Sequence, residues 1–284
     1  MRRFEYYKPS SLEEAWELKA KIPDSLFIAG GTDVLVSIQN DECRPKALIS
    51  LRSIPELDGI ETGDAPRIGA LTIIGDILQH PELGRRYPIL GEAAKSLGSV
   101  QIRNVATIGG NLCNASPCAD MALPLLVLDA KLRLKTPKET REVPISEFFK
   151  GPAETCLSPQ EIVTDILLEP PQKNMKTCFM KKGRVKMDLA VASVAVLLEM
   201  EGKRCRKARI AAGSVAPTPL RLHKVESVLE DAAISSRTVA KAQQLTEDEI
   251  VPITDIRSSE EYRRQITGVL VKRALERALE WSQP

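Results

Sequence analysis

The chain has 284 residues, of which 43% are hydrophobic and 27% are charged. This length exceeds the usual size of one core and predicts two or three packed units, and the composition excludes collagen-like, largely disordered and membrane proteins. Lys and Arg number 40 against 38 Asp and Glu, so a net charge of +2 gives no indication of nucleic acid or an anionic membrane as partner.

The amino-terminal residues, Met1 to Pro9, are basic but lack the apolar stretch of a secretory signal. No run approaches the roughly 18 apolar residues that span a bilayer, so we expect a cytoplasmic protein without a membrane span. Six cysteines are scattered along the chain, unlike the framework of a short secreted domain, and we interpret them as reduced thiols. Cys113 and Cys118 are spaced like the first pair of an iron–sulfur motif, but the third cysteine is missing and no metal site is expected.

The first half of the chain predicts one capped helix followed by short strands and further helices. Ser11-Leu12-Glu13-Glu14 is a capping box and begins a helix that ends before Pro23. Short apolar runs next to charges or turn residues predict strands over residues 26–29, 47–51, 67–71 and 130–135. Helical spacing of apolar residues predicts helices within residues 72–98 and 121–128.

Pro170-Pro171 is the clearest domain boundary, because paired prolines interrupt both helix and sheet. We predict a first domain over residues 1–172, with subdomains 1–58 and 59–172, and a second domain over 173–284. In the second domain we predict strands over residues 177–181, 190–201 and 207–212 and helices over 224–232, 236–245 and 259–281. The last helix begins at a second capping box and carries on one side Tyr262, Ile266, Val269, Leu270 and Ala274.

Two segments contain adjacent glycines, Ala29-Gly30-Gly31-Thr32-Asp33 and Thr107-Ile108-Gly109-Gly110-Asn111. We expect each to be a loop after an apolar strand, where glycines permit positive φ and gather backbone N–H groups around phosphate oxygens. Neither segment matches the Rossmann or P-loop pattern, which disfavours the common nucleotide folds. One such pair usually marks only a turn, whereas two favour a phosphate-containing ligand without naming it.

The two glycine segments resemble the flavin subunits of the xanthine dehydrogenase and carbon monoxide dehydrogenase family. Further similar segments are Phe4-Glu5-Tyr6, Asn114 to Asp120, Ala212 to Arg221 and Ser258 to Arg264, so the resemblance runs nearly end to end. It implies an α+β protein, in which a two-subdomain FAD-binding fold of the p-cresol methylhydroxylase (vanillyl-alcohol oxidase) type precedes a smaller α+β domain. FAD would lie between the subdomains.

The same resemblance implies which residues hold FAD. One side of the pyrophosphate would contact Ile28, Ala29, Gly30, Gly31, Thr32, Asp33 and Val34. The other side would contact Thr107, Gly109, Gly110 and Asn111. Asp120 would accept hydrogen bonds from hydroxyl or amine groups of the cofactor, unless it is instead the N-cap of a helix after Pro117.

Three further positions concern the flavin ring. Lys181 lies in a segment that resembles the family's stretch near the isoalloxazine, where a cation would stabilise the reduced, anionic flavin. Lys182 is the rival for this role, and both lysines are equally well interpreted as solvated charges at a strand end. Ile162 would pack against the cofactor or belong to the ordinary core. Animal members of the family carry an aromatic ring where this chain has Leu97, which puts stacking on the flavin in doubt.

No catalytic side chain is expected, because the cofactor carries the chemistry and the only histidines, His80 and His223, are interpreted as surface or structural residues. The resemblance implies an FAD-binding electron-transfer subunit of a multi-subunit molybdenum hydroxylase. Its partners would be an iron–sulfur subunit and a molybdopterin subunit, with NAD or another compound as electron acceptor. Two alternatives stay open: a stand-alone flavoprotein oxidoreductase of the same fold, and a non-catalytic interaction subunit that has lost FAD.

Overall fold

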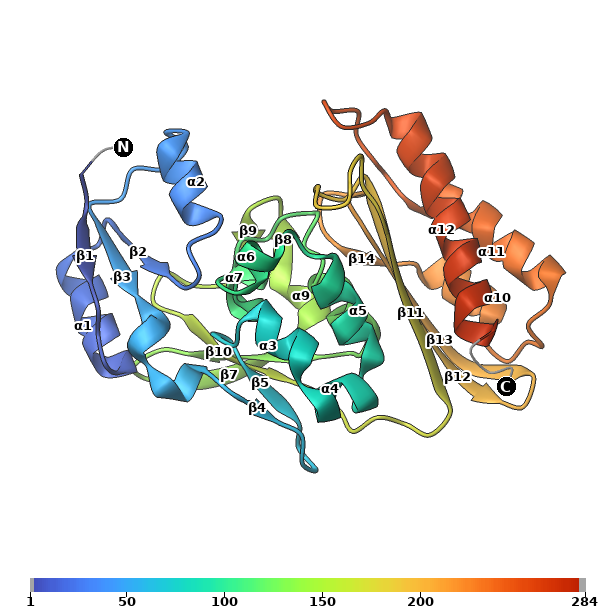
Figure 1. The fold of residues 1–284 in the computed structure, drawn as a ribbon, viewed down its shortest axis with the longest axis horizontal. Coiled ribbons are helices and arrows are strands. Elements are labelled where there is room, and N and C mark those ends of the chain that lie inside the picture. Colours follow the sequence, from blue (N-terminus) through green and yellow to red (C-terminus); the bar gives the residue numbers. More distant parts are fainter. Residues whose placement is uncertain (1–2, 281–284) are drawn as a thin grey trace.

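A computed structural model of the chain describes residues 3–280 and shows three larger sheets in a row, each with its own helices (Figure 1). The first unit is a parallel sheet in the order β1-β3-β2. Its elements are β1 (Glu5–Tyr7), α1 (Leu12–Lys21), β2 (Ser25–Ile28), α2 (Val34–Gln39) and β3 (Ala47–Ser50). The predicted cap of α1 is confirmed, since the Ser11 hydroxyl accepts a hydrogen bond from the Glu14 N–H at 3.2 Å. The Glu14 carboxylate accepts its reciprocal bond from the Ser10 N–H, one residue before the position that a capping box uses.

The second unit is an antiparallel sheet in the order β4-β5-β10-β6-β7, with short helices packed on one face. Its strands are β4 (Ile60–Glu61), β5 (Arg67–Gly69), β6 (Lys131–Lys135), β7 (Thr140–Pro144) and β10 (Ile162–Leu167), beside the small hairpin β8 (Phe149–Gly151) and β9 (Glu154–Thr155). Its helices are α3 (Ile74–Gln79), α4 (Pro81–Arg86), α5 (Pro88–Ser96), α6 (Val100–Arg103), α7 (Ile108–Cys113), α8 (Ala122–Val127) and α9 (Ile145–Phe148). The helical stretch predicted over 72–98 is divided at Pro81 and Pro88, because proline is tolerated only in the first turn of a helix.

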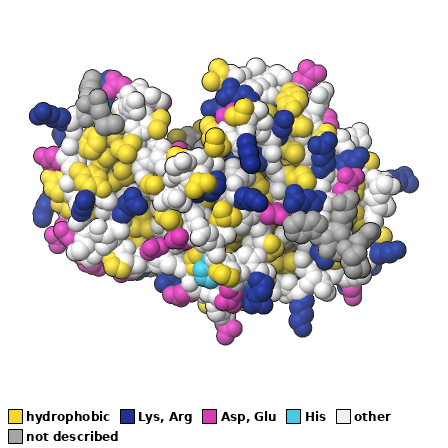
Figure 2. Space-filling model, in the orientation of Figure 1, with side chains coloured by type: hydrophobic (Ala, Val, Ile, Leu, Met, Phe, Trp, Pro, Cys, Tyr) yellow, Lys and Arg dark blue, Asp and Glu magenta, His cyan; other side chains and the backbone are white. Residues whose placement is uncertain are grey.

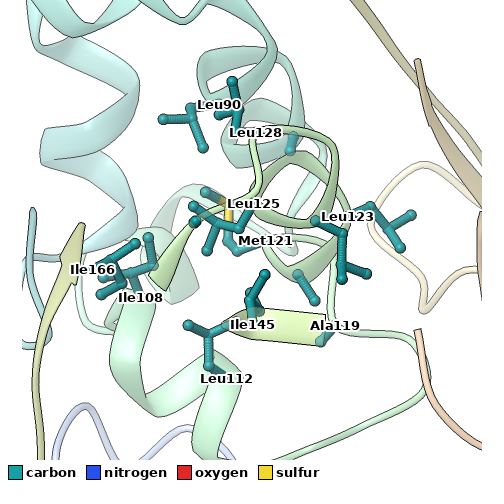
Figure 3. Packing of buried hydrophobic residues seen from close by; sticks show 14 of the residues in the cluster. Leu90, Ile108, Leu112, Ala119, Met121, Leu123, Leu125, Leu128, Ile145 and Ile166 are labelled. Atoms are coloured by element: carbon teal, nitrogen blue, oxygen red, sulfur yellow. The ribbon is translucent and has the colours of Figure 1, made fainter. Parts of the chain in front are cut away.

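The core of this unit forms around α8, whose residues are buried on every side. Figure 3 shows Leu125 of α8 among Leu90 of α5, Ile108 of α7 and Ile166 of β10. A helix that is apolar all round cannot lie at a surface, and here it packs against α5, α9 and the C-terminal sheet. The apolar run predicted as a buried helix over 121–128 is therefore confirmed.

The C-terminal unit is an antiparallel sheet in the order β11-β12-β13-β14, covered on its outer face by helices (Figure 1). Its elements are β11 (Met175–Lys182), β12 (Ala192–Glu201), β13 (Arg204–Gly213), β14 (Leu220–Arg221), α10 (His223–Leu229), α11 (Ser236–Glu249) and α12 (Glu260–Glu280). Along β12, Ala195 and Leu197 join the core of the second unit, whereas Val194 and Val196 join the core under the helices. The sheet is thus buried on both faces, as successive side chains of a strand point to opposite sides.

The strands and helices that we predicted for this unit are confirmed, with two qualifications. Tyr262 is 43% exposed and does not share the buried side of α12 with Leu270 and Ala274, so that assignment was wrong. Tyr262 lies in the first turn of α12, where the buried side chain is that of its neighbour Arg263, which donates hydrogen bonds to the carbonyls of Val191 and Ser214. Trp281, the predicted end of the helix, lies outside the described residues. Among the helices within residues 3–280, none combines the length and the hydropathy needed to cross a membrane.

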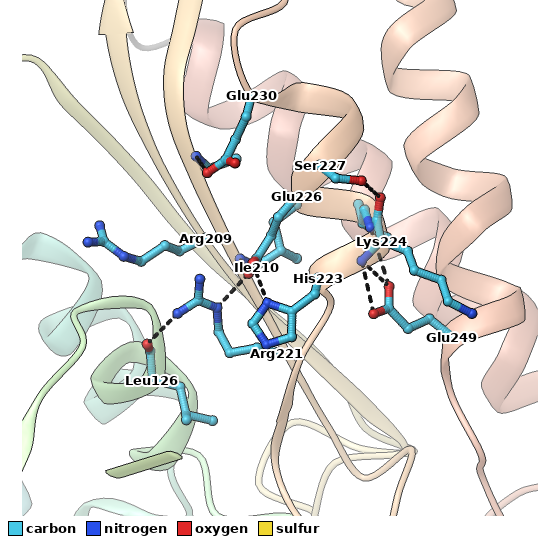
Figure 4. A network of polar contacts seen from close by, with 12 residues as sticks. Leu126, Arg209, Ile210, Arg221, His223, Lys224, Glu226, Ser227, Glu230 and Glu249 are labelled. Carbon is cyan, nitrogen blue, oxygen red and sulfur yellow. Dashed lines mark hydrogen bonds and ion pairs between the residues drawn. The ribbon is translucent and has the colours of Figure 1, made fainter. Parts of the chain in front are cut away.

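A polar network joins the C-terminal sheet to α8 (Figure 4). The guanidinium of Arg221 donates hydrogen bonds to the Leu126 carbonyl at 3.3 Å and to the carboxylate of Asp129 at 2.9 Å, and it also contacts Glu226. The buried Glu226 accepts a further bond from the Ile210 N–H at 2.8 Å. Buried charges are stable only when paired and hydrogen-bonded, so this network fixes the orientation of the two domains.

Candidate functional site

One cavity of about 590 Å³ lies where the first two units meet and the C-terminal domain approaches them. All fourteen residues that we expected at the cofactor line it: Ile28, Ala29, Gly30, Gly31, Thr32, Asp33, Val34, Thr107, Gly109, Gly110, Asn111, Asp120, Ile162 and Lys181. These residues come from separate segments between β2 and β11, and the fold brings them around one space of the size that small-molecule ligands occupy.

The first glycine segment connects β2 to α2, and each of its two positions requires glycine for a separate structural reason. Gly31 has φ of +81°, the left-handed conformation that glycine adopts without strain. At Gly30 an added Cβ would lie 2.3 Å from the Val105 carbonyl oxygen and 3.0 Å from the Ala106 Cα. The first segment therefore packs backbone against backbone on the residues that precede the second segment.

The second glycine segment is not the loop that we expected, and neither Gly109 nor Gly110 has positive φ. Both glycines lie in the first turn of α7, because the hydroxyl of Thr107 caps the helix by accepting a hydrogen bond from the Gly110 N–H at 3.0 Å. Glycine is required for close approach instead: a Cβ on Gly109 would lie 2.7 Å from the Cβ of Ala70. A Cβ on Gly110 would lie 3.7 Å from the Cβ of Ala29, so the two glycine segments face each other across the cavity wall.

Asp120 and Lys181 form a buried ion pair at the cavity, with 2.6 Å between Oδ2 and Nζ. The Lys181 ammonium also donates a hydrogen bond to the Ser96 carbonyl at 3.2 Å. Burial raises the pKa of Asp120 to about 6, and the positive charge of Lys181 opposes this rise. The carboxylate is not a helix N-cap, since α8 has Met121 in that position, and Lys181 is not a solvated charge. Lys182, the rival, is exposed to solvent.

The second oxygen of Asp120 provides a test of whether the site suits a cofactor. Its Oδ1 atom is buried and has no hydrogen-bond partner among the described residues. A buried carboxylate oxygen without a donor is rare in proteins, because an unmade hydrogen bond is costly. An ionised carboxylate only accepts hydrogen bonds, so a hydroxyl or amine of a bound molecule fits this atom.

The apolar part of the wall contains Ile162 and Leu97. Ile162 belongs to the core around α1, as one of its two interpretations expected, and it also lines the cavity. Leu97 likewise lines the cavity. Asn111 is partly engaged, because its side-chain carbonyl accepts a hydrogen bond from the Met121 N–H at 3.3 Å.

Several lining residues were missed from the sequence: Leu71, Cys113, Cys118, Met187, Asp188 and Leu189. The last three lie on the connection between β11 and β12, where nothing in the local sequence indicates a distant cavity. Within residues 3–280 no group of three or more His, Cys, Asp or Glu side chains is arranged to hold a metal ion. The structural interpretation of the histidines is confirmed: His80 accepts a hydrogen bond from the Leu83 N–H at the start of α4, and His223 pairs with Glu226.

Comparisons with known proteins identify the family of the chain. Residues 2–170 match the model of the FAD binding domain in molybdopterin dehydrogenase, and residues 177–278 match the CO dehydrogenase flavoprotein C-terminal domain. The chain is 31% identical to the xanthine dehydrogenase FAD-binding subunit of Escherichia coli O157:H7, over 96% of this chain and 95% of that one. It is 34% identical to the carbon monoxide dehydrogenase medium chain of Hydrogenophaga pseudoflava, over 97% of both chains.

A solved structure gives the same result for the fold. Carbon monoxide dehydrogenase from Hydrogenophaga pseudoflava superposes with a TM-score of 0.95, over 98% of both chains and with 33% identity. The two-domain α+β architecture expected from the sequence is thereby confirmed, as is FAD as the cofactor. The chain belongs to the FAD-binding medium subunits of the xanthine dehydrogenase and carbon monoxide dehydrogenase family of molybdenum hydroxylases.

Proposed function

We propose that this chain is the electron-transfer subunit of a molybdenum hydroxylase complex and passes electrons from iron–sulfur clusters of a partner chain through FAD to NAD. The observation that carries the proposal is the lining of a single cavity by all fourteen residues expected at FAD. The relatives support a molybdenum-containing partner. One of them is the medium chain of a carbon monoxide dehydrogenase, and that enzyme was solved in a form that lacks the Mo-pyranopterin moiety of its molybdenum cofactor.

Each part of the cavity has a role in this proposal. The backbone of Gly30-Gly31 and of Thr107 to Asn111 would hold the diphosphate, since these segments approach each other without side chains between them. The free Oδ1 of Asp120 would accept a hydrogen bond from FAD, and Lys181 would hold the carboxylate in place. Leu97 would form an apolar wall that excludes water.

When bound, FAD would receive the electrons that arrive from the clusters and pass them on as a pair to the acceptor. The chain itself contributes binding, orientation and electrostatics, as in other proteins whose cofactor carries the chemistry. The stand-alone oxidoreductase is disfavoured, because the relatives that match along their whole length are named as subunits or medium chains.

The proposal is tested by purifying the tagged chain from its source cells and identifying the co-purifying chains by mass spectrometry. We expect FAD on this chain, together with one partner that holds iron–sulfur clusters and one that holds molybdenum. After anaerobic reduction by the substrate of the complex, added NAD should reoxidise the flavin. A chain that purifies alone and oxidises a substrate by itself would contradict the proposal.

A further inference from the structure

The turn that leads from α5 to α6 forms part of the wall of the flavin cavity. It consists of Ser96, Leu97 and Gly98, of which Leu97 and Gly98 line the cavity. Gly98 has φ of +48°, and an added Cβ there would lie 3.1 Å from the Cγ2 of Ile102 in α6. The 96–98 turn therefore packs directly against α6, which lines the same cavity through Ile102.

Two cations bind the three successive carbonyls of the 96–98 turn. The Lys181 ammonium donates a hydrogen bond to the Ser96 carbonyl at 3.2 Å. Nη1 of Arg103 donates to the carbonyls of Leu97 at 2.9 Å and of Gly98 at 3.0 Å. Carbonyls at the end of a helix have no N–H of a following turn to bind and carry partial negative charge, so cations are favourable there. The backbone of the turn is thus held at every carbonyl.

Lys181 and Arg103 differ in their other contacts. Lys181 is paired with Asp120 and lines the flavin cavity itself. Arg103 is half-buried, does not line that cavity, and forms no ion pair with any residue between 3 and 280. Within this range, the hydrogen bonds of its guanidinium all go to the 96–98 turn. Arg103 thus acts on a ligand in the cavity through the turn rather than by contact.

The flavin cavity reaches the surface beside α6. Ile102 lines the cavity and is still 39% exposed, and Val100 on the same helix is 59% exposed. Figure 2 shows the surface hollowed between the first unit and the C-terminal domain, and α6 lies below this hollow in the same orientation (Figure 1). Water that enters at this side would weaken the electrostatic interactions that a dry site provides. The buried side chain of Leu97 excludes water here only while its backbone is fixed.

We propose that Arg103 is a positioning residue of the flavin site, an inference that rests on the proposed function. By binding the carbonyls of Leu97 and Gly98, it keeps the Leu97 side chain against bound FAD and closes the α6 side of the cavity to water. Arginine suits this task, because Nη1 carries two N–H groups in a rigid planar fork and can serve both acceptors at once. The guanidinium also stays charged at every physiological pH, so the wall does not depend on protonation.

The first test measures the Kd for FAD in the complex after reversible removal of the flavin, together with the visible circular dichroism of bound FAD. In Arg103→Gln the Kd should rise at least about tenfold, because the site loses its fixed wall. The dichroism of the flavin ring should change for the same reason, whereas a merely structural role of Arg103 would lower the stability of the chain and leave this spectrum as it is.

A conservative variant and a matched control accompany this test. Arg103→Lys retains the cation but has a shorter reach, so it should fold even if Arg103→Gln does not, and its Kd should rise about threefold. The control is Arg237→Gln, which changes an exposed arginine on α11 that does not line the cavity. A Kd and a spectrum equal to those of the control in either Arg103 variant would overturn the inference.

The second test repeats both measurements in Leu97→Ala and in Leu97→Ala combined with Arg103→Gln, or with Arg103→Lys if the former does not fold. If Arg103 acts through Leu97, its substitution should change the Kd by less than about twofold once the Leu97 side chain is absent, since residues that act as one unit are not additive. An equal factor in both backgrounds would overturn the inference. Wild-type flavin signals in Leu97→Ala would contradict the Leu97 wall of the proposed function, and the inference with it. Altered signals in Leu97→Ala with unaltered signals in the Arg103 variants contradict the inference alone.

Discussion

Lys181 of β11 and Asp120 of the segment before α8 meet with 2.6 Å between ammonium and carboxylate, and their side chains are only 9% and 5% exposed. The pair connects the C-terminal domain to the second unit at the wall of the flavin cavity. Because an unpaired charge in such a place costs several kcal/mol, the pair contributes to holding the two domains in their relative position. The flavin site therefore depends on Lys181 of the C-terminal domain, whereas the other residues that we expected at FAD belong to the first domain.

This pair predicts how stability changes with pH in the flavin-free chain. The pKa of Asp120 in the folded chain is about 6, above its ordinary value of 3.8, so the folded state holds the proton more tightly than the unfolded state. The resulting stabilisation is complete below pH 4 and is lost as the pH rises through 6. A difference of 6 − 3.8 = 2.2 pKa units corresponds to about 3 kcal/mol at most.

The measurement compares the wild type with Asp120→Asn by denaturant unfolding between pH 4 and pH 7. The free energy of unfolding of the wild type should fall relative to that of the variant over this range, since the variant has no proton to lose. A difference between the two proteins that stays constant with pH would show that Asp120 titrates normally.

The variant Gly110→Val should release FAD and still fold. The new Cβ would lie 2.8 Å from the Thr107 hydroxyl oxygen, in the wall of the cavity, and would disturb the cap of α7. A lost cap costs about 1 kcal/mol, so the free energy of unfolding should fall by no more than about 2 kcal/mol while most of the flavin is lost. The control is Gly84→Val in α4, where an added Cβ has nothing within 4 Å. Full flavin content in Gly110→Val would argue against the role of this segment.

The substitution Gly30→Ala should lower the free energy of unfolding by more than the addition of one methyl group would suggest. Its methyl group would lie 2.3 Å from the Val105 carbonyl oxygen, so one of two packed backbone segments must move. Such overpacking costs about 1–3 kcal/mol. In the control Gly63→Ala the methyl group meets nothing within 4 Å, and a change within about 0.5 kcal/mol is expected. The urea concentration at the midpoint of unfolding is measured for both variants. Equal midpoints would contradict the close contact between Gly30 and the Val105 carbonyl.

The polar network of Figure 4 predicts a strong effect of Glu226→Ala. Removal of this buried carboxylate leaves the Ile210 N–H without its acceptor and Arg221 without one of its partners. Breaking a buried ion pair costs about 3–5 kcal/mol. His223, which is 74% exposed, contributes little, so His223→Ala should change the free energy of unfolding by less than about 1 kcal/mol. The melting temperatures of the two variants are compared by thermal unfolding. Similar melting temperatures for Glu226→Ala and His223→Ala would contradict this account.

Local patterns in the sequence were sufficient to predict those parts of the fold and the site that each lie within one continuous segment of the chain. The strand before Gly30, the N-cap Ser11 and the buried helix α8 depend on spacing and turn residues, which a sequence displays directly. In the second predicted capping box the cap is Ser259 and not Ser258, since the Ser259 hydroxyl accepts a hydrogen bond from the Tyr262 N–H at 3.2 Å. The second glycine segment was wrongly predicted to be a loop. Two adjacent glycines are typical of a turn, and this pattern was preferred to the interpretation of Thr107 as the N-cap of a helix.

Relationships between distant residues could not be predicted in the same way. Lys181 lies 61 residues from Asp120, and no rule of spacing distinguishes it from Lys182 as the partner. The reason for Gly30 is a contact with Val105, which belongs to another unit of the fold. Met187, Asp188 and Leu189 of the β11–β12 connection reach the flavin cavity only after the chain has folded, so their spacing in the sequence does not indicate it.

The crystal structure of the FAD-loaded complex tests the central claim most directly. We predict electron density for FAD in the cavity that Gly30-Gly31 and Thr107 to Asn111 line, with a cofactor hydroxyl or amine within hydrogen-bond distance of the free Oδ1 of Asp120. Density for FAD at another place on the chain, with water alone in this cavity, would contradict the account.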